Sequence, residues 1–331
     1  MNDPLEITEA EAIEVASSHD DWIADRRGHI TGTDIAAIFG LSKFRTPMDI
    51  WLEKRHEAPE QEVNDQMKWG NRLERGILLG YQEETGIPLT FADPHKLIVA
   101  PEFPLLGATL DARHKGGDFR PVDAKNVGRA QSADWGDSET DNIPMYYALQ
   151  LHVQMIVTGT QLADLAALLW GSDFRRYTVH ADADITATIK TESEAWWKRH
   201  IINGECPPID GSKSTADYLA RKFAKNTEAL LPSNSEVDTI AVSLREVRKS
   251  LEEQEAIKDA YQNQLKALIG DAAGITGEWG KVTWKKIKDG EKVNWEALAN
   301  SLGATAEQVK QFTERTHGYR RFLPKFKEEG E

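Results

Sequence analysis

The stretch from Leu105 to Lys125 predicts a β-hairpin of two short arms, the second of which ends in alternating apolar and polar residues. Glycines at residues 116–117 mark the turn between the arms. Because successive side chains of a strand point to opposite faces, Asp123 and Lys125 share one face of the second arm. The first arm can bring Asp111 beside them, so we expect the rest of the chain to be arranged around this hairpin.

The segments on either side of the hairpin predict a mixed β-sheet flanked by helices. Apolar residues recur at helical spacing before the hairpin and again after a polar segment over 126–142, which predicts a loop, and the segments that follow the second helical pattern predict strands. The predicted helices cover residues 7–18, 35–40, 48–54, 67–81 and 144–159, with a closing helix through 195–199, and the predicted strands after the hairpin cover 162–170 and 175–180.

The helix expected over residues 67–81 carries one acidic residue at the edge of its apolar stripe. Leu73 and Ile77 belong to the stripe, and Glu74 flanks it. One interpretation is a solvated glutamate paired with Arg75. The alternative is a third acidic group that faces the aspartates of the hairpin.

The pattern changes after a Pro- and Gly-rich exit that ends near residue 212, so we expect one large domain over 1–212 and an extension over 213–331. From Val237, apolar residues recur close to a heptad step, which predicts an antiparallel helical pair or a short coiled coil. The step runs through Ile240, Leu244, Val247, Leu251, Tyr261, Leu265 and Leu268, with Gln254 and Lys258 interrupting it.

The remaining parts of the extension predict a helical stretch over 218–231, a strand over 278–287 and a short helix over 295–302. Basic and aromatic residues interleave over 318–327. This composition suits contact with a nucleic-acid backbone, and it suits an ordinary edge strand equally well.

Composition limits the class of protein. The chain has 331 residues, of which 40% are hydrophobic and 28% charged, so it can bury a sizeable core. It contains no run of 18 apolar residues and begins with an acidic segment, which disfavours a membrane span or a secretory signal and makes the cytoplasm the expected location. The single cysteine, Cys206, excludes an internal disulfide and an iron–sulfur cluster.

The net charge of −14 disfavours a protein that coats DNA, because backbone affinity comes from lysines and arginines that displace counterions. It counts less against a nuclease, since metal ligands are acidic and basic residues need only line one groove.

The acidic residues of the hairpin favour metal-assisted hydrolysis of a phosphodiester. Asp111 and Asp123 offer oxygen ligands to a hard divalent cation, and Lys125 stands two positions after the second carboxylate. A phosphate could also bind near Thr33, which precedes an apolar helix that stops at Gly40, with Arg26 just upstream. The alternative is that Thr33 only caps the helix and Arg26 is a surface charge.

Several motifs occur together in a fixed order, and their set resembles phage-type alkaline exonucleases of the lambda exonuclease, or YqaJ-like viral recombinase, family of PD-(D/E)xK nucleases. The resemblance covers about residues 22–206. It rests on Trp22-x-x-x-Arg26, the segment from Ile30 to Gly40, Met67-Lys68-Trp69-Gly70 leading to Glu74, Thr109-Leu110-Asp111, Asp123-Ala124-Lys125, and Tyr147 to Gln154.

This resemblance implies a restriction-endonuclease-like α/β core, a mixed central sheet flanked by helices, with a mainly helical C-terminal extension. It assigns metal binding to Asp111 and Asp123, with Glu74 completing the carboxylate set. Lys125 is implied to position and activate the attacking water, and Gln150 to support the site from the helix behind it. Asp123 stands where the phage prototype has Glu, a shorter arm that this class tolerates.

The same resemblance implies a pocket for a terminal 5′-phosphate formed by Arg26, Thr33 and Thr109. The implied activity is 5′-to-3′ digestion of double-stranded DNA ends, leaving 3′ single-stranded tails for phage-type homologous recombination. Mg²⁺ is the expected metal, because the ligands are all oxygen, and Mn²⁺ can substitute.

The expected partners are double-stranded DNA ends, a single-strand annealing protein and further copies of the chain in a ring, most often a trimer. A phage or prophage gene acting in the bacterial cytoplasm is implied. Two alternatives stay open: a structure-specific endonuclease of the same fold, and a non-catalytic DNA-binding or host-interaction protein.

Overall fold

The computed structural model describes residues 20–59, 64–117, 119–290, 292–314, 318–322 and 324. The helix predicted over 7–18 lies outside these residues. The chain divides into two compact units, Met1–Tyr218 and Leu219–Glu331. Among the described residues, no helix is long and apolar enough to cross a membrane.

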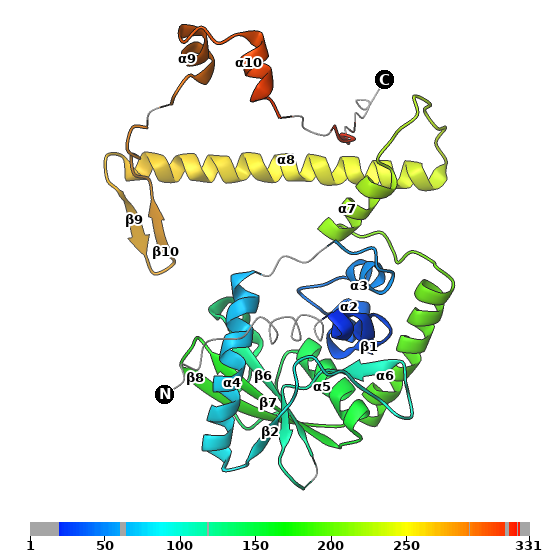
Figure 1. Cartoon of the computed structure of the whole chain (residues 1–331). Coiled ribbons are helices and arrows are strands. Elements are labelled where there is room, and N and C mark those ends of the chain that lie inside the picture. Colours follow the sequence, from blue (N-terminus) through cyan, green and yellow to red (C-terminus); the bar gives the residue numbers. More distant parts are fainter. Residues whose placement is uncertain are drawn as a thin grey trace. The chain divides into compact units, whose positions relative to one another are not determined.

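A five-stranded sheet forms the centre of the first unit (Figure 1). It runs in the order β2-β5-β6-β7-β8, and only β6 and β7 pair in parallel. The parallel pair requires a crossover, which α5 provides. The strands are β2 (Leu89–Phe91), β5 (Ala112–His114), β6 (Pro121–Val127), β7 (Leu162–Leu169) and β8 (Asp173–His180), and α5 spans Met145–Thr158.

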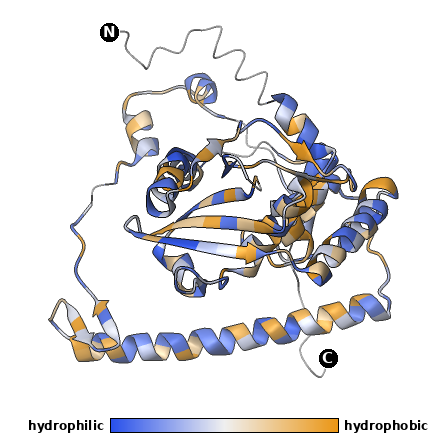
Figure 2. Ribbon diagram, turned by 90° about the horizontal axis from the view of Figure 1, so that it is seen from below, coloured by the Kyte–Doolittle hydropathy of each residue, from blue (hydrophilic) through white to orange (hydrophobic). Residues whose placement is uncertain are grey.

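Helices cover both faces of this sheet. Along β7, Leu165 and Ala167 pack with α5, whereas Ala166 between them packs with α4 (Asp65–Thr85). Figure 2 shows the apolar residues that run along the central strands. The predicted fold class, a mixed sheet flanked by helices, is therefore confirmed.

The predicted hairpin is correct for its second half and wrong for its first. Residues 116–117 form the turn, with positive φ angles of 84° and 67° that glycine adopts without strain, and β5 pairs with β6. The first arm, however, belongs to another sheet as β4 (Leu106–Ala108), between β1 (Ile30–Thr31) and β3 (Ile98–Val99). All three residues of β4 are buried, because β4 has a neighbouring strand along each edge. In a two-stranded hairpin, one edge would have no neighbour.

Short helices precede and follow the sheet. Thr31 rather than Thr33 caps α2 (Gly32–Ile38), in a capping box, and Gly40, which the sequence marks as the helix stop, has a φ of 69° after the helix end. The others are α3 (Pro47–Lys54), the 3₁₀ turn η1 (Arg129–Asp134), α6 (Ala183–Trp196), the π-helical turn η2 (Trp197–Ile202) and α7 (Lys213–Lys222).

In the second unit, the long helix α8 (Ser235–Ile269) has 35 residues and is a single helix rather than a helical pair. The helical stretch predicted over 218–231 is also wrong beyond Lys222, because no helix continues from there to Asn234, which caps α8. Part of the predicted strand is present as β10 (Gly280–Thr283), paired with β9 (Gly274–Gly277). The helix α9 (Trp295–Ser301) confirms the prediction for 295–302, and α10 (Ala306–Gln311) follows it.

Candidate active site

Asp123 is the centre of the site. It lies on β6, is 1% exposed, and points to the face of the sheet that α5 covers. Gln150 and Gln154, one turn apart on α5, donate their side-chain amides to Asp123 Oδ1 over 2.8 and 2.9 Å. The ammonium of Lys125 contacts Asp123 Oδ2. The strand alternation that predicted a shared face for Asp123 and Lys125 is confirmed.

Asp111 reaches the same place from the connection between β4 and β5. Its Oδ2 accepts a 2.8 Å hydrogen bond from the backbone N–H of Ala124 on β6. The neighbouring strand β5 begins only at Ala112, so it offers no carbonyl oxygen to the backbone N–H of Ala124. The Asp111 carboxylate accepts the hydrogen bond from this N–H instead. Asp111 therefore lies in the connection between the two sheets, with its side chain directed to β6.

Burial and neighbouring carboxylates raise the pKa of two acidic residues of the site, Asp111 and Glu74. Burial and the nearby Asp123 raise the pKa of Asp111 to about 8, with Glu74 adding to the effect and Lys125 opposing it. Burial and Asp123 likewise raise the pKa of Glu74, which is half-buried on α4. Burial of Lys125 favours its neutral form, but Asp123 and Asp111 outweigh it and raise the pKa of the ammonium. The structure therefore brings Glu74, Asp111 and Lys125 together near Asp123.

This donor set fits a divalent cation in its chemistry. Glu74, Asp111 and Asp123 supply three carboxylates beside the one ammonium of Lys125, and burial together with Asp123 raises the pKa of Asp111. Among the described residues, no three His, Cys, Asp or Glu side chains already stand close enough to form a metal-binding group. Binding a metal here would require the carboxylates to draw closer.

The three residues expected to bind a terminal phosphate come from different segments, and Trp22 links two of them. Its ring lies under the Arg26 guanidinium, 4.8 Å from centroid to Cζ, and its Nε1 donates to Thr109 Oγ1 over 2.8 Å. Thr33 is exposed at the start of α2, and its hydroxyl lies 3.1 Å from that of Thr31. Thr109 is two residues before Asp111, so this group adjoins the carboxylates along the chain.

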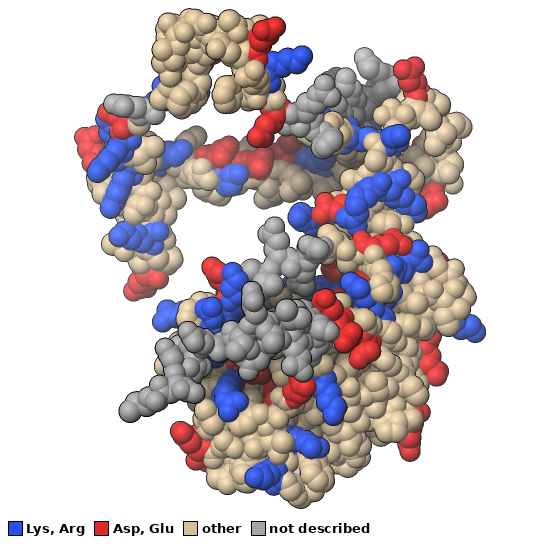
Figure 3. All heavy atoms as spheres, viewed as in Figure 1, with Lys and Arg blue, Asp and Glu red and all other residues tan. Residues whose placement is uncertain are grey.

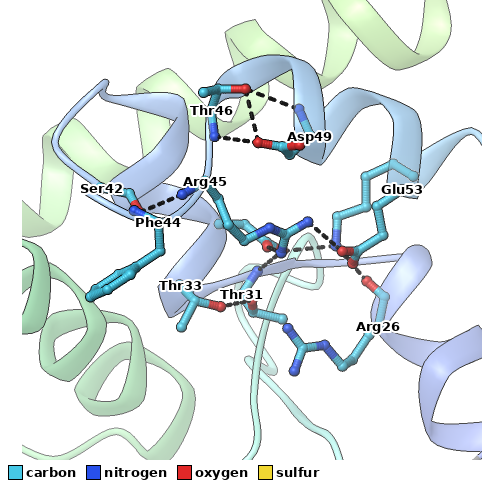
Figure 4. Close-up of polar contacts among 11 residues, drawn as sticks. Arg26, Thr31, Thr33, Ser42, Phe44, Arg45, Thr46, Asp49 and Glu53 are labelled. Carbon is cyan, nitrogen blue, oxygen red and sulfur yellow. Dashed lines mark hydrogen bonds and ion pairs between the residues drawn. The ribbon is translucent and has the colours of Figure 1, made fainter. Parts of the chain in front are cut away.

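An ion-pair cluster lies beside Arg26 and Thr31 (Figure 4). Asp34 is fully buried and pairs with Lys54 over 2.8 Å and with Arg45 over 3.2 Å. Lys54 also donates to the backbone carbonyl of Arg26 over 2.7 Å. Burial opposes ionisation of Asp34, but Lys54, Arg45 and Arg26 outweigh it and hold its pKa well below the usual range. The cluster ties α2, α3 and the helical residues 20–27 together.

Gly32 brings the segment that carries Thr33 against the helix that carries Gln150. It lies at the start of α2 against α5, where an added Cβ would stand 2.9 Å from the Cα of Gln150 and 3.0 Å from its carbonyl oxygen. Only a residue without a side chain permits this approach. The backbone just before Thr33 therefore packs against Gln150, the residue that donates a hydrogen bond to Asp123.

Replacing Gly32 with Ala should destabilise the first unit, because the new methyl group forces α2 away from the α5 backbone. Overpacking of this kind typically costs about 1–3 kcal/mol. Denaturant unfolding followed by tryptophan fluorescence measures the change. The matched control is Gly76→Ala on α4, where a Cβ would meet nothing within 4 Å and stability should be unchanged or rise. Equal effects of the two substitutions would contradict the close approach.

Sequence reasoning missed several members of the site. Gln154 lies four residues after Gln150, and this spacing signalled a shared face without distinguishing its role. Tyr147, whose ring centroid lies 5.3 Å from Lys125 Nζ, had no separate signal. Asp34 follows Thr31 at capping-box spacing, but nothing local indicated that Lys54 would be buried against it.

Comparison with known proteins finds one matching family model and a similar curated protein. The model of the YqaJ-like viral recombinase domain matches residues 21–161. A Bacillus subtilis (strain 168) protein described as "Uncharacterized protein YqaJ" is 26% identical over 315 residues, which cover 92% of this chain and 93% of that protein. The similarity to YqaJ thus extends over both compact units.

Two solved structures are also similar to part of the chain. An alkaline exonuclease from Laribacter hongkongensis is 23% identical with a TM-score of 0.46, covering 61% of this chain and 97% of that chain. A phage-related exonuclease from Haemophilus somnus 129PT is 13% identical with a TM-score of 0.41, covering 54% of this chain and 96% of that chain.

The family match spans both groups of site residues. It runs from the helical segment that carries Arg26, through the strand that carries Asp123, to the helix that carries Gln150. The motifs that indicated this family, from Trp22 to Gln154, all lie within the residues that match the model of the YqaJ-like viral recombinase domain.

Proposed function

We propose that this protein is a Mg²⁺-dependent 5′-to-3′ exonuclease of double-stranded DNA that leaves 3′ single-stranded tails for phage-type homologous recombination. The observation that carries the proposal is the convergence of Asp111, Asp123 and Lys125 on one buried face inside the segment that matches the recombinase family.

In this proposal Asp111, Asp123 and Glu74 hold the metal, and their oxygen ligands favour Mg²⁺, with Mn²⁺ as a substitute. A bound divalent cation would supply an activated water and stabilise the charge that develops on the phosphate. Lys125, kept as an ammonium by the neighbouring aspartates, donates hydrogen bonds at the same place. The amides of Gln150 and Gln154 fix the orientation of Asp123.

The end of the substrate is bound by the group around Trp22. Arg26 offers a guanidinium to a terminal 5′-phosphate, and the hydroxyls of Thr33 and Thr109 add hydrogen bonds. Because Thr109 Oγ1 already accepts from Trp22, its own proton is directed elsewhere and can be donated to the phosphate. α2 has only seven residues, so these side chains rather than its dipole carry the pocket.

The overall charge of −14 is compatible with this function if the basic residues act locally. On the face shown in Figure 3, basic and acidic side chains are interspersed rather than separated into single-sign areas. Individual contacts such as that of Arg26 would then contribute more than a broad basic surface. We also propose, from the family resemblance, a trimeric ring of subunits and a single-strand annealing protein as partner.

Replacing Arg26 with Ala should slow digestion of 5′-phosphorylated ends about ten- to a hundredfold and nearly erase their advantage over 5′-hydroxyl ends. One charge-assisted hydrogen bond of this kind is worth on the order of 1.5–3 kcal/mol. Initial rates on two duplexes that differ only in the terminal phosphate measure the effect.

The neighbouring Arg27 provides the matched control, because its guanidinium contacts His56 Nδ1 over 3.1 Å. Arg27→Ala should keep the preference for phosphorylated ends. If the unmodified protein digests both ends at the same rate, the phosphate pocket is wrong.

Comparison of a linear duplex with a covalently closed circle of the same sequence tests the proposed activity. In Mg²⁺, an exonuclease degrades the linear form and leaves the circle intact. Nicking of the circle would instead identify a structure-specific endonuclease, and intact linear DNA in both Mg²⁺ and Mn²⁺ would identify a non-catalytic DNA-binding protein.

A further inference from the structure

The helix α8 carries a regular apolar seam that the proposed hydrolysis does not use. The seam positions follow one another by alternating steps of three and four residues, the spacing of a coiled coil. We call the α8 seam the set Val237, Ile240, Leu244, Val247, Leu251, Gln254, Lys258, Tyr261, Leu265 and Leu268. It extends over about four and a half heptads, beyond the three to four that indicate a coiled coil.

Within the described part of the chain, the α8 seam is uncovered. Ile240 is 61% exposed, Leu251 59%, Tyr261 63% and Leu268 75%, and no member of the seam is buried. Figure 2 shows the apolar positions recurring along the helix between polar ones. An apolar stripe of this length on a surface marks a protein contact.

We propose that the α8 seam binds the α8 seam of a second copy of the chain as an antiparallel two-stranded coiled coil. The seam is self-complementary in one centred register, in which the two-fold axis passes between Glu252 and Glu253. Every seam position then meets a seam position of the partner. The layers pair Val237 with the partner's Leu268, Ile240 with the partner's Leu265, Leu244 with the partner's Tyr261, Val247 with the partner's Lys258, and Leu251 with the partner's Gln254.

The polar seam residues decide the direction. In a parallel pair in register, Lys258 would stand opposite the partner's Lys258, and two ammonium groups would face each other inside the seam. In the antiparallel pair, Lys258 packs its aliphatic stem against the partner's Val247 and keeps its charge at the edge, near Glu255 of its own helix, whose Oε1 lies 3.8 Å away.

Charges beside the seam match the same register. Arg248 and Glu255 each follow a seam residue on the same side of the helix. In the antiparallel pair, Arg248 lies beside the partner's Glu255, and the symmetry creates this contact twice. Opposite charges at such flanking positions select the partner and its orientation. In a parallel pair, Arg248 would lie beside Ser243 instead.

Disulfide trapping tests the direction in the full-length chain with Cys206→Ser as background. Leu244→Cys and Tyr261→Cys are made separately and also co-expressed with tags of different size. After mild oxidation, the antiparallel pair predicts a mixed cross-linked dimer from co-expression and little cross-linking of either variant alone. Cross-linking of Leu244→Cys with itself would establish a parallel pair, and absence of all cross-links would overturn the seam contact.

Sedimentation velocity tests whether the seam holds two copies together. Leu251→Glu should halve the mass of the assembly, whatever other interfaces exist, because it places charges at the centre of the contact. The matched control is Val242→Glu, an exposed apolar residue of α8 that lies outside the seam, and it should leave the mass unchanged. An unchanged mass for Leu251→Glu would contradict the proposal. That result is also expected if a different protein, rather than a second copy of the chain, covers the α8 seam.

Discussion

Replacing Asp123 with Asn should reduce DNA hydrolysis to background, a loss of at least about a thousandfold, equivalent to about 4 kcal/mol of activation free energy. The side-chain amide keeps an oxygen that accepts from Gln150 and Gln154, so the packing of α5 on the sheet survives. What is lost is the negative charge that faces Lys125 and that we propose binds the metal. Product release from a radiolabelled linear duplex measures the rate.

Stability should change little in this variant. The substitution removes a partner of Lys125, but it also relieves the repulsion that raises the pKa values of Asp111 and Glu74. Asp111→Asn and Lys125→Ala should likewise abolish hydrolysis while the protein remains folded. Full activity in any of these variants would place the active site elsewhere.

Asp164 is the matched control, because it is an equally buried aspartate of the same sheet. It is 2% exposed and accepts hydrogen bonds from Tyr81 over 2.6 Å and from Thr178 over 2.7 Å, away from the α5 face. Asp164→Asn should lower the free energy of unfolding and keep the rate per folded molecule. If both aspartate variants lose activity in proportion to stability, Asp123 is structural rather than catalytic.

Replacing Lys54 with Met should destabilise the first unit by about 3–5 kcal/mol, because it leaves the buried carboxylate of Asp34 without its nearest cation. Both side chains are fully buried and lie 2.8 Å apart. The carbonyl of Arg26 loses its donor at the same time. Denaturant unfolding at pH 7 measures the change.

The double variant Lys54→Met, Asp34→Asn separates charge from packing. It removes both charges, so it should recover most of the stability that the single variant loses. A double variant as unstable as Lys54→Met would mean that shape rather than charge matters here.

The same ion pair makes stability depend on pH. The pKa of Asp34 is lower in the folded than in the unfolded chain, so its contribution is present above about pH 4 and is lost as pH falls through the folded value. The double variant should lose this part of the acid sensitivity.

The active-site strand and the helix behind it could be predicted because local patterns dominate there. Strand alternation put Asp123 and Lys125 on one face, and helical spacing put Gln150 with Gln154. The proposed functional roles rest on the order of motifs rather than on any one motif.

Other features depend on contacts between distant segments. The strand β4 has three residues, all buried, and nothing in them distinguishes an arm of a hairpin from the centre of a small sheet. Lys54 is typical of a surface residue until Asp34, twenty positions earlier, is brought against it. Gly32 gave no sign that α5 would lie against it. Tertiary packing, which no local pattern encodes, decides each of these positions.

Digestion of one linear duplex, labelled either at a 5′ end or at a 3′ end, tests the central claim most directly. With Mg²⁺ present, we expect the 5′ label to appear as mononucleotide at the earliest times, while the 3′ label stays in long fragments. Chelation of the metal, or Asp123→Asn, should stop both. Early release of the 3′ label, or release of either label without a divalent metal, would contradict a metal-dependent 5′-to-3′ exonuclease at this site.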